Sequence, residues 1–352
     1  MKKLLKFSES INNALDLAMK KNKKVIILGL GVDDPKRIFS TTKLLKEKYG
    51  SQRVFDMPTA ENGMTGIAIG CSLEGFRPII SHQRVEFSLL AMEQIINQAA
   101  KWNYMNAGQR SVPIVIRLII GRGWGQGPQH SQSLESIFAH IPGLKVVSPS
   151  NAYDAKGLLL SSIEDNNPVI FFEHRWLHES LGNVPKKYYK IPIGKAKIVN
   201  KGKDITIVSS SLMTVEAMKC LKIFKKYKIN PEIIDLRSIR PLDKKTILKS
   251  VNKTKRLLAV DNGWTNFGIS SEIISLVSEN LSDKLKSKPV RIGVNDSPIP
   301  SSRALAKYCY PSVNEIIKSV FKMLDKKINK KDLIKLPLNK TDVPDDTFKG
   351  PF

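Results

Sequence analysis

The sequence predicts an α/β protein of two domains, each a mostly parallel β-sheet with helices on both faces. Its 352 residues are enough for two domains of ordinary size. Short apolar segments alternate with helix-like segments, a pattern typical of a parallel sheet covered on both faces. The alternation stops in a stretch with two prolines at 178–192 and then restarts, which indicates a second domain.

Residues 1–192 are expected to form the first domain. It opens with an amphipathic helix that places Ile11, Leu15 and Ala18 on one face, and an apolar strand follows at 25–29. The pattern then repeats, with strands expected at 113–120, 145–148 and 168–172 and helices at 90–106 and 153–164.

Residues 193–328 are expected to form a second domain of the same class. Strands are expected at 204–208, 231–235 and 256–260, and helices at 214–227 and 270–281. The chain then becomes polar and contains several prolines. Residues 329–352 are therefore expected to form a tail that wraps a neighbouring chain or stays mobile.

The chain is strongly basic, with 57 Lys plus Arg against 32 Asp plus Glu and a net charge of +25. Such a charge attracts phosphorylated ligands, acidic proteins or nucleic acid. The lysines are scattered through helix-like stretches, without zinc-finger spacing or an RNA-binding aromatic signature. A solvated basic surface or an acidic partner is therefore favoured over nucleic acid.

The cysteines and the N-terminus indicate a cytoplasmic protein. Cys71, Cys220 and Cys309 are far apart and form no CxxC pair, so they are expected to be structural thiols in a reducing compartment. The opening MKKLLKF is followed at once by polar residues, so it forms no signal-peptide core. No apolar run approaches the roughly 18 residues of a membrane span, so no membrane association is expected.

Glu61 is the most promising acid. It precedes a small-residue helix with Gly63, Gly66 and Gly70, and glycines allow close backbone approach. The carboxyl group is therefore expected in a tightly packed, poorly solvated place, which suits proton exchange with a ring nitrogen. A structural interpretation, a helix N-terminal Glu favoured by the helix dipole, is the stronger one from these residues alone.

The glycine-dense segment 121–132 carries His130. It follows a buried strand and is expected at the carboxyl edge of the sheet, where α/β folds bind ligands. Of the five histidines, His130 is the one best placed for catalysis. The others are interpreted as ordinary hydrogen-bonded, loop or interface residues, and none shows metal-ligand spacing such as HExxH. No glycine-rich phosphate motif occurs, so no diphosphate cradle is predicted.

Several long segments resemble a known family, the beta subunit of the decarboxylating component of 2-oxo acid dehydrogenases of the pyruvate and branched-chain type. The matching segments are 48–70, 77–108, 112–117, 129–173 and 232–260. Together they follow the family from about residue 5 to 325, which is far more specific than a single motif. This coverage outweighs the structural interpretation of Glu61.

The resemblance implies a pyrimidine-binding domain followed by a transketolase C-terminal-type domain, with thiamine diphosphate as cofactor. In this family the residue matching Glu61 hydrogen-bonds the aminopyrimidine nitrogen, and the one matching Phe87 packs on that ring. Gln83 stands at a further cofactor-facing position. The histidine matching His130 lies near the substrate, where it orients a carboxylate or moves protons.

The resemblance also implies two metal ions. The turn at 162–167 resembles one that binds potassium mostly through backbone carbonyls, with the ligands Ile114, Ser162, Ile163, Asp165 and Asn167. A helix C-terminal turn without metal stays an equal alternative. In the family the magnesium and diphosphate site lies on a separate alpha subunit, which explains the missing cradle. An alpha2-beta2 assembly, and acyl transfer to a lipoyl-bearing acyltransferase, are implied.

Some positions depart from the family. Gln83 stands where Met is frequent, Val85 where an aromatic residue is frequent, and the loop 118–127 carries Arg122 and Trp124. Bulky and basic side chains at the entrance to the active site favour a larger or anionic 2-oxo acid. Two alternatives stay open: half of a split transketolase or acyloin-forming carboligase with an aldehyde acceptor, and a basic scaffold without catalysis.

Overall fold

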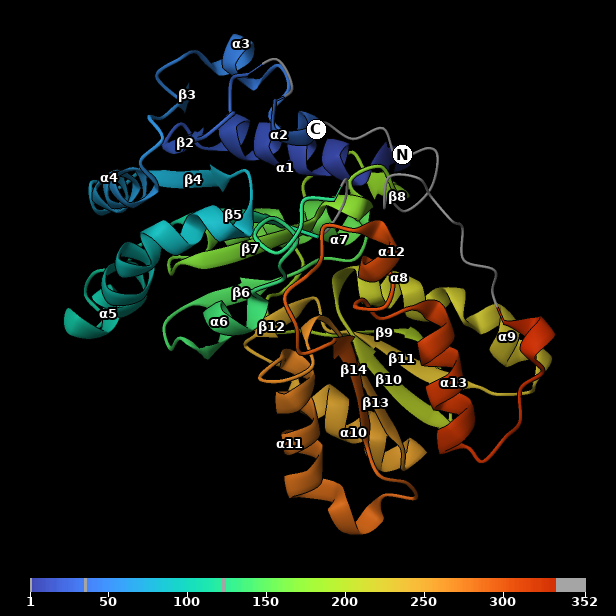
Figure 1. Ribbon diagram of the computed structural model, residues 1–352. Helices are drawn as coiled ribbons and strands as arrows, with labels where there is room; N and C mark the ends of the chain where they lie inside the picture. Colours follow the sequence, from blue (N-terminus) through green and yellow to red (C-terminus); the bar gives the residue numbers. More distant parts are fainter. Residues whose placement is uncertain (1, 35–36, 122–124, 334–352) are drawn as a thin grey trace. The chain divides into compact units, whose positions relative to one another are not determined.

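The computed structural model describes residues 2–34, 37–121 and 125–333 (Figure 1). The described chain divides into two units: the first contains residues 2–121 and 137–193, and the second contains 125–136 and 194–333. The expected active-site residues Arg122 and Trp124, and residues 334–352 of the tail predicted at 329–352, lie outside the described residues.

The core of the first unit is a parallel sheet. Its strands lie side by side in the order β6, β7, β5, β4, β2 and β3, and every neighbouring pair is parallel. Their bounds are β2 (Val25–Gly29), β3 (Val54–Asp56), β4 (Arg77–His82), β5 (Val115–Ile120), β6 (Lys145–Val147) and β7 (Val169–His174). A separate antiparallel ribbon pairs β1 (Lys2–Lys6) with β8 (Leu181–Pro185).

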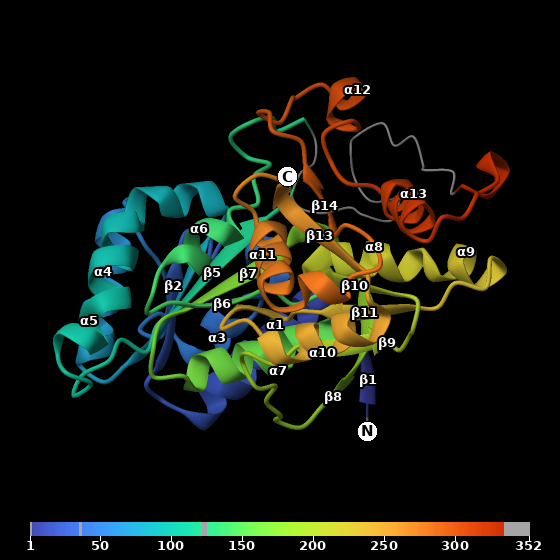
Figure 2. The same cartoon turned by 90° about the horizontal axis from the view of Figure 1, so that it is seen from below.

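Helices cover this sheet. α1 (Phe7–Lys21) and α7 (Ala152–Glu164) pack side by side (Figure 2). Asn151 caps α7, because its side-chain oxygen accepts a hydrogen bond from the backbone N of Asp154 at 2.9 Å. α4 (Glu61–Leu73) packs against β4 and η1 (Val85–Ala91). The remaining helices are α2 (Arg37–Ser40), α3 (Leu45–Tyr49), η2 (Gln94–Ala99), α5 (Ala100–Met105), α6 (Glu135–His140) and η3 (Arg175–Leu177).

The second unit is built on a smaller sheet in the order β14, β13, β10, β11 and β9, where only β9 is antiparallel to its neighbour. The strands are β9 (Lys197–Asn200), β10 (Ile205–Ser209), β11 (Pro231–Asp235), β13 (Leu257–Trp264) and β14 (Val290–Val294). A short strand, β12 (Ser238–Arg240), follows β11.

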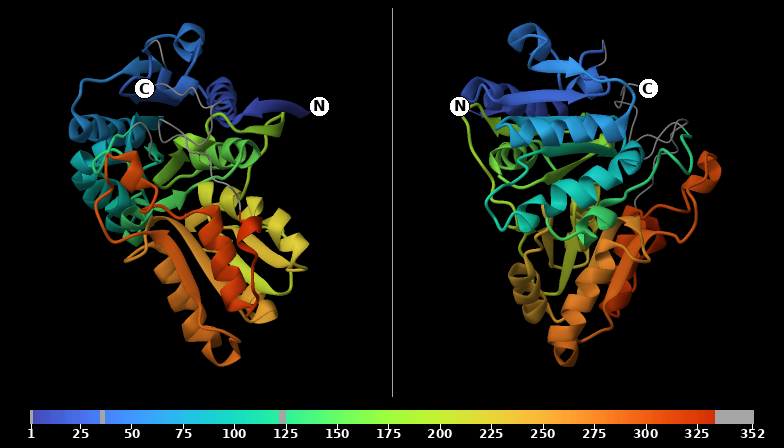
Figure 3. Two further views of the ribbon diagram at one scale, coloured as in Figure 1. Left: turned by 45° about the vertical axis from the view of Figure 1, so that its right-hand side comes forward. Right: turned by 90° about the vertical axis from the view of Figure 1, so that its left-hand side faces the viewer.

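Helices flank this second sheet (Figure 3). α8 (Ser211–Lys219) packs with α13 (Val313–Met323), and α10 (Lys244–Thr254) packs with α11 (Ile269–Leu281). The shorter helices are α9 (Leu221–Lys226), η4 (Ser282–Lys284), α12 (Arg303–Ala306) and η5 (Lys330–Asp332). No described helix is both long enough and apolar enough to cross a membrane.

The structure confirms the predicted fold class, since both sheets are mostly parallel and carry helices. Two details differ from the sequence prediction. The single helix expected at 90–106 is instead the end of a 3-10 segment, a π-helical segment and then the α-helix α5. Residues 125–136 make their contacts in the second unit: Ser131 O accepts a hydrogen bond from Tyr310 Oη at 3.2 Å.

Candidate functional site

Glu61 is the first residue of α4, in the connection that leaves β3. Its side chain is buried, and the residue is 5% exposed. No described residue donates a hydrogen bond to its carboxylate, whereas its backbone oxygen accepts one from Thr65 Oγ1 at 2.8 Å. The helix dipole favours a negative charge at this position. Glu61 is thus a largely buried residue whose carboxylate accepts no hydrogen bond within the described chain.

Two of the three glycines of α4 lack the close neighbours that the sequence suggested, whereas a side-chain carbon at Gly66 would lie 3.5 Å from Gln94 Oε1. Within the described chain no atom lies within 4 Å of the place where a side-chain carbon of Gly70 would stand. At Gly63 the nearest such atom, the Cβ of Ala60, is 4.0 Å away. The low exposure of Glu61 is therefore not caused by close backbone packing at these two glycines.

Gln83 lies at the carboxyl edge of the first sheet, directly after β4. Gly31, which follows β2, has a φ of +73°, and a side-chain carbon there would lie 2.5 Å from Gln83 Nε2 and 2.9 Å from an oxygen of Asp34. The positive φ favours glycine at this position. The Gln83 side chain, which is exposed, therefore stands over the loop that leaves β2.

Glu61, Gln83 and Phe87 share one edge of the first sheet. They follow β3 and β4, parallel strands whose carboxyl ends meet at the same edge. Phe87 is half-buried in η1, which packs against α4. The three residues that the resemblance assigned to the cofactor thus belong to one unit and to one edge of its sheet.

His82, beside Gln83, is fully buried, and neither of its ring nitrogens hydrogen-bonds a described residue. Burial lowers its pKa to about 4, so the ring is neutral at physiological pH. The hydrogen-bonded role expected for His82 is therefore wrong for the described chain.

His130 belongs to the second unit. It is half-buried in the loop before α6. Gly127, with a φ of +66°, lies so close to Ser301 that a side-chain carbon would be 2.3 Å from Ser301 Oγ. Gly127 and Ser131, on either side of His130, thus both have neighbours in the second unit, Ser301 and Tyr310.

Sequence reasoning missed a pair of buried acids near this loop. Glu135 is 1% exposed, and its Oε1 has no hydrogen-bond partner among the described residues. Burial, and next the nearby Asp261, raise the pKa of Glu135 to about 8. Asp261 accepts backbone hydrogen bonds from Gly263 at 3.1 Å and Ser270 at 3.0 Å, and burial raises its pKa as well. In the sequence Glu135 resembles any acidic residue at a helix start.

A second missed set is a buried polar network in the first unit. Arg117 on β5 donates to Glu173 on β7, to Ser81 on β4 at 3.1 Å and to Thr41 at 2.9 Å. His178 Nε2 lies 3.2 Å from Glu173 Oε2. Near-complete burial with several partners indicates a structural role, because a buried charge is stable only when it is paired.

The residues implied as potassium ligands lie close to one another. Ile114 O accepts a hydrogen bond from Val169 N at 3.0 Å, which places the strand residue beside the start of β7. Ser162 O accepts one from Asp165 N at 3.3 Å, and Asn167 N donates to Asp165 Oδ1 at 2.9 Å. The five implied ligands therefore lie at one end of α7 or beside the strand that follows it.

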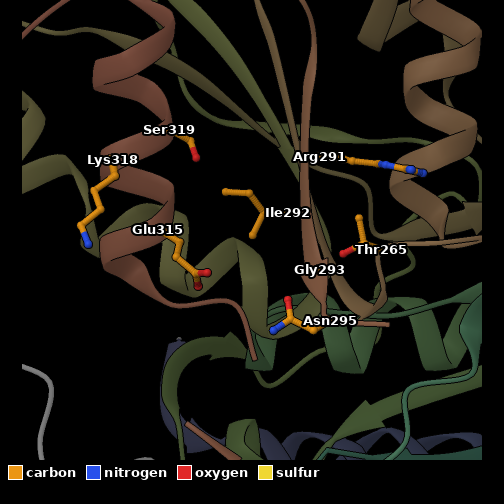
Figure 4. A pocket seen from close by; sticks show the side chains of 8 residues that line it. All are labelled: Thr265, Arg291, Ile292, Gly293, Asn295, Glu315, Lys318 and Ser319. Atoms are coloured by element: carbon orange, nitrogen blue, oxygen red, sulfur yellow. The ribbon is translucent and has the colours of Figure 1, made fainter. Parts of the chain in front are cut away.

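A shallow depression in the second unit lacks convergent chemistry (Figure 4). Arg291 and Lys318 extend to opposite sides of it. Arg291 Nη2 lies 3.4 Å from Asn266 Oδ1, and Glu315 accepts a hydrogen bond from Ser312 N at 2.7 Å as part of the α13 cap. Arg291 and Glu315 are thus engaged in local structure.

Two protein families match the chain. Residues 3–179 match the family described as transketolase, pyrimidine binding domain. Residues 194–316 match the transketolase C-terminal domain. The two matches cover the same two series of strands and helices that the sequence predicted.

Curated relatives match over most of the chain. The mitochondrial pyruvate dehydrogenase E1 component subunit beta of Pisum sativum is 42% identical over 315 residues, covering 88% of this chain and 88% of the relative. The subunit beta of Porphyra purpurea is 41% identical, covering 91% and 96%. That of Rickettsia felis is 38% identical, covering 90% and 97%.

A solved structure shares the fold. A protein described as a split gene transketolase, inactive beta4 tetramer, superposes with a TM-score of 0.73 and 22% identity. The match covers 92% of this chain and 99% of that chain. At this identity the likeness concerns the fold alone.

Proposed function

This chain belongs to the family of pyruvate dehydrogenase E1 component beta subunits, and from that premise we propose which residues act and what a partner must supply. It is the beta subunit of a thiamine-diphosphate-dependent 2-oxo acid dehydrogenase component, an oxidoreductase. The observation that carries this conclusion is identity of about 40% to three such subunits over about nine tenths of the chain.

Glu61 is proposed to hold and exchange a proton with the pyrimidine ring nitrogen of the coenzyme. The residue is largely buried and starts a helix, and no described residue donates a hydrogen bond to its carboxylate, so the carboxylate can bond a ligand nitrogen. Phe87 supplies an aromatic surface for the ring, and Gln83 supplies an amide at the same sheet edge. When bound, thiamine diphosphate supplies the electron sink for decarboxylation.

His130 is proposed to orient the substrate carboxylate or to move a proton at the substrate. The support is its half-buried position in the glycine-rich loop, between Gly127, which lies close to Ser301, and Ser131, whose carbonyl oxygen accepts a hydrogen bond from Tyr310.

An alpha subunit is the partner that family membership implies, and we propose an alpha2-beta2 assembly in which that subunit holds magnesium and the diphosphate. The sequence carries no glycine-rich diphosphate cradle. The first unit also exposes large apolar side chains on neighbouring helices, as expected for a surface that another subunit covers. They are Ile67, Leu89, Leu90, Tyr104 and Met105.

The proposed substrate is pyruvate, with a lipoyl group on an acyltransferase as acceptor, in line with the names of the relatives. The exposed amide of Gln83 favours a more polar or anionic 2-oxo acid as the second candidate. Val85 has no part in this choice within the described chain, because it is fully buried.

A cytoplasmic location is proposed, supported by three free cysteines. Relatives occur both with a mitochondrial name, as in Pisum sativum, and without one, as in Rickettsia felis. The carboligase and scaffold alternatives are not favoured, because the relatives from Pisum sativum, Porphyra purpurea and Rickettsia felis are all dehydrogenase subunits.

The test is reconstitution. The chain is co-expressed with an alpha subunit, and carbon dioxide release is measured against a panel of 2-oxo acids with lipoyl and aldehyde acceptors. We expect pyruvate decarboxylation and lipoyl acylation from the pair, and neither from the chain alone. Carbon–carbon bond formation with an aldehyde in place of lipoyl acylation would reject the dehydrogenase assignment.

A further inference from the structure

The turn that follows α7 is already filled by cationic side chains of this chain. Arg77, the first residue of β4, directs its guanidinium at the end of α7. Its Nη1 donates to Ile163 O at 2.9 Å and to Asp165 O at 3.0 Å, and its Nη2 donates to Asn166 Oδ1 at 2.6 Å. One guanidinium therefore binds three oxygens within four successive residues.

A second cation binds the same turn from another strand. Lys145, at the start of β6, places its ammonium nitrogen 2.5 Å from Asp165 Oδ2. The other oxygen of that carboxylate accepts from Asn167 N at 2.9 Å. Both side-chain oxygens of Asp165 are thus engaged.

Two of the five positions implied as potassium ligands are bound by cationic side chains of this chain. Ile163 O and Asp165 O accept hydrogen bonds from Arg77, and the Asp165 carboxylate accepts one from Lys145. A potassium ion placed among them would displace these donors and would lie next to two fixed positive charges, which repel it. The residues therefore do not fit the ion.

We propose that the guanidinium of Arg77 takes the place of potassium in this chain and closes the turn at 162–167 without a metal ion. The arrangement agrees with helix physics, because cations that donate to the last carbonyls of a helix stabilise its C-terminus. It also connects the start of β4 to the end of α7 through a side chain of the protein itself. β4 ends just before Gln83.

The experiment measures stability and metal binding, so it does not depend on catalysis. Thermal unfolding of the full chain is recorded in KCl and in NaCl of equal concentration, about 0.1 M, which would saturate a millimolar site. We expect the same melting temperature in both salts. A higher melting temperature in KCl than in NaCl would overturn the proposal.

Two variants identify the guanidinium. Arg77→Ala is expected to lower the melting temperature, and potassium, but not sodium, is expected to restore part of the loss. The matched control is Arg53→Ala, because Arg53 Nη2 likewise donates to backbone carbonyls, Met19 O and Asn22 O, both at 3.0 Å. That variant is expected to lose stability equally in both salts. If potassium restores nothing in Arg77→Ala, the guanidinium does not act in its place.

A third measurement uses the unaltered chain, so it stands even if Arg77→Ala does not fold. Crystals are grown with thallium(I) in place of potassium, and the anomalous signal is examined at the turn. No peak is expected among Ile114 O, Ile163 O and Asp165 O. A peak there would show a monovalent cation site and would reject the proposal.

Discussion

Arg117 and Glu173 form a bidentate ion pair inside the first unit: Arg117 Nε lies 2.6 Å from Glu173 Oε1, and Nη2 lies 3.0 Å from Oε2. Their side chains are 1% and 0% exposed. The pair connects two neighbouring strands, β5 and β7, and binds a third through Ser81. The pair connects strands in the middle of the sheet. Its contribution to the free energy of unfolding can be measured directly.

Arg117→Met is expected to destabilise the chain by about 3 to 5 kcal/mol, because it leaves Glu173 charged and buried without its main partner. Urea unfolding measures the loss. The control is Lys219→Met, which removes the exposed pair of Lys219 with Glu216 and should cost less than about 1 kcal/mol. Equal losses in the two variants would contradict the structural role of the buried pair.

Acid is expected to remove the stabilisation that Glu173 provides. Burial alone raises the pKa of Glu173, but the charge of Arg117 and the hydrogen bonds from His178 and Arg117 outweigh it and hold the pKa at about 2. The unfolded value is 4.5, so the stabilisation is complete above pH 4.5 and is lost as the pH falls through 2. The free energy of unfolding, measured from pH 5 to 2, should fall less in Glu173→Gln than in the parent. At pH 5 the variant should already be the less stable of the two.

Glu61→Gln is expected to reduce decarboxylation by the reconstituted pair by about a hundredfold or more, since proton transfer contributes roughly that factor. Glutamine keeps the size of the side chain but cannot carry the proton. The melting temperature should be unchanged. Glu74→Gln, an exposed change at the other end of α4, is the control and should keep full activity. Full activity in Glu61→Gln would reject the proposed role.

Glu135→Gln is expected to stabilise the chain at pH 8 and above. The pKa of Glu135 is raised from 4.5 to about 8, so the native state favours the protonated acid. That stability is complete below pH 4.5 and is lost as the pH rises through 8. Melting temperatures from pH 5 to 9 should decline less in the variant than in the parent. The exposed Glu272→Gln should reproduce the parent curve.

His82→Leu is expected to protect the chain from mild acid. The pKa of His82 is lowered from 6.5 to about 4 by burial, so unfolding takes up a proton between these values. The contribution to stability is complete above pH 6.5 and is lost as the pH falls through 4. Unfolding measured over this range should vary less in the variant. His140→Gln, at an exposed position, serves as the control, and a flattened curve in that control would contradict the assignment.

The sequence predicted the strands well where burial is carried by continuous apolar residues. The strand expected at 25–29 is β2, and the one expected at 231–235 is β11. It was less successful at 90–106, where one regular helix was expected. A π-helical segment forms i→i+5 hydrogen bonds in place of the i→i+4 bonds of an α-helix, and the apolar pattern of the side chains did not indicate this local change.

The sequence by itself determined the class of the fold and the family, and it singled out Glu61 as a candidate, because these depend on local patterns and on a long continuous resemblance. Only the tertiary structure decided that Arg77 reaches the turn after α7, that Arg117 pairs with Glu173, and that Glu135 lies beside Asp261. Each of these contacts joins residues more than 50 positions apart in the chain. Burial raises or lowers the pKa of an ionisable group, and it decides whether the group is paired or neutral. Burial is a property of the folded chain.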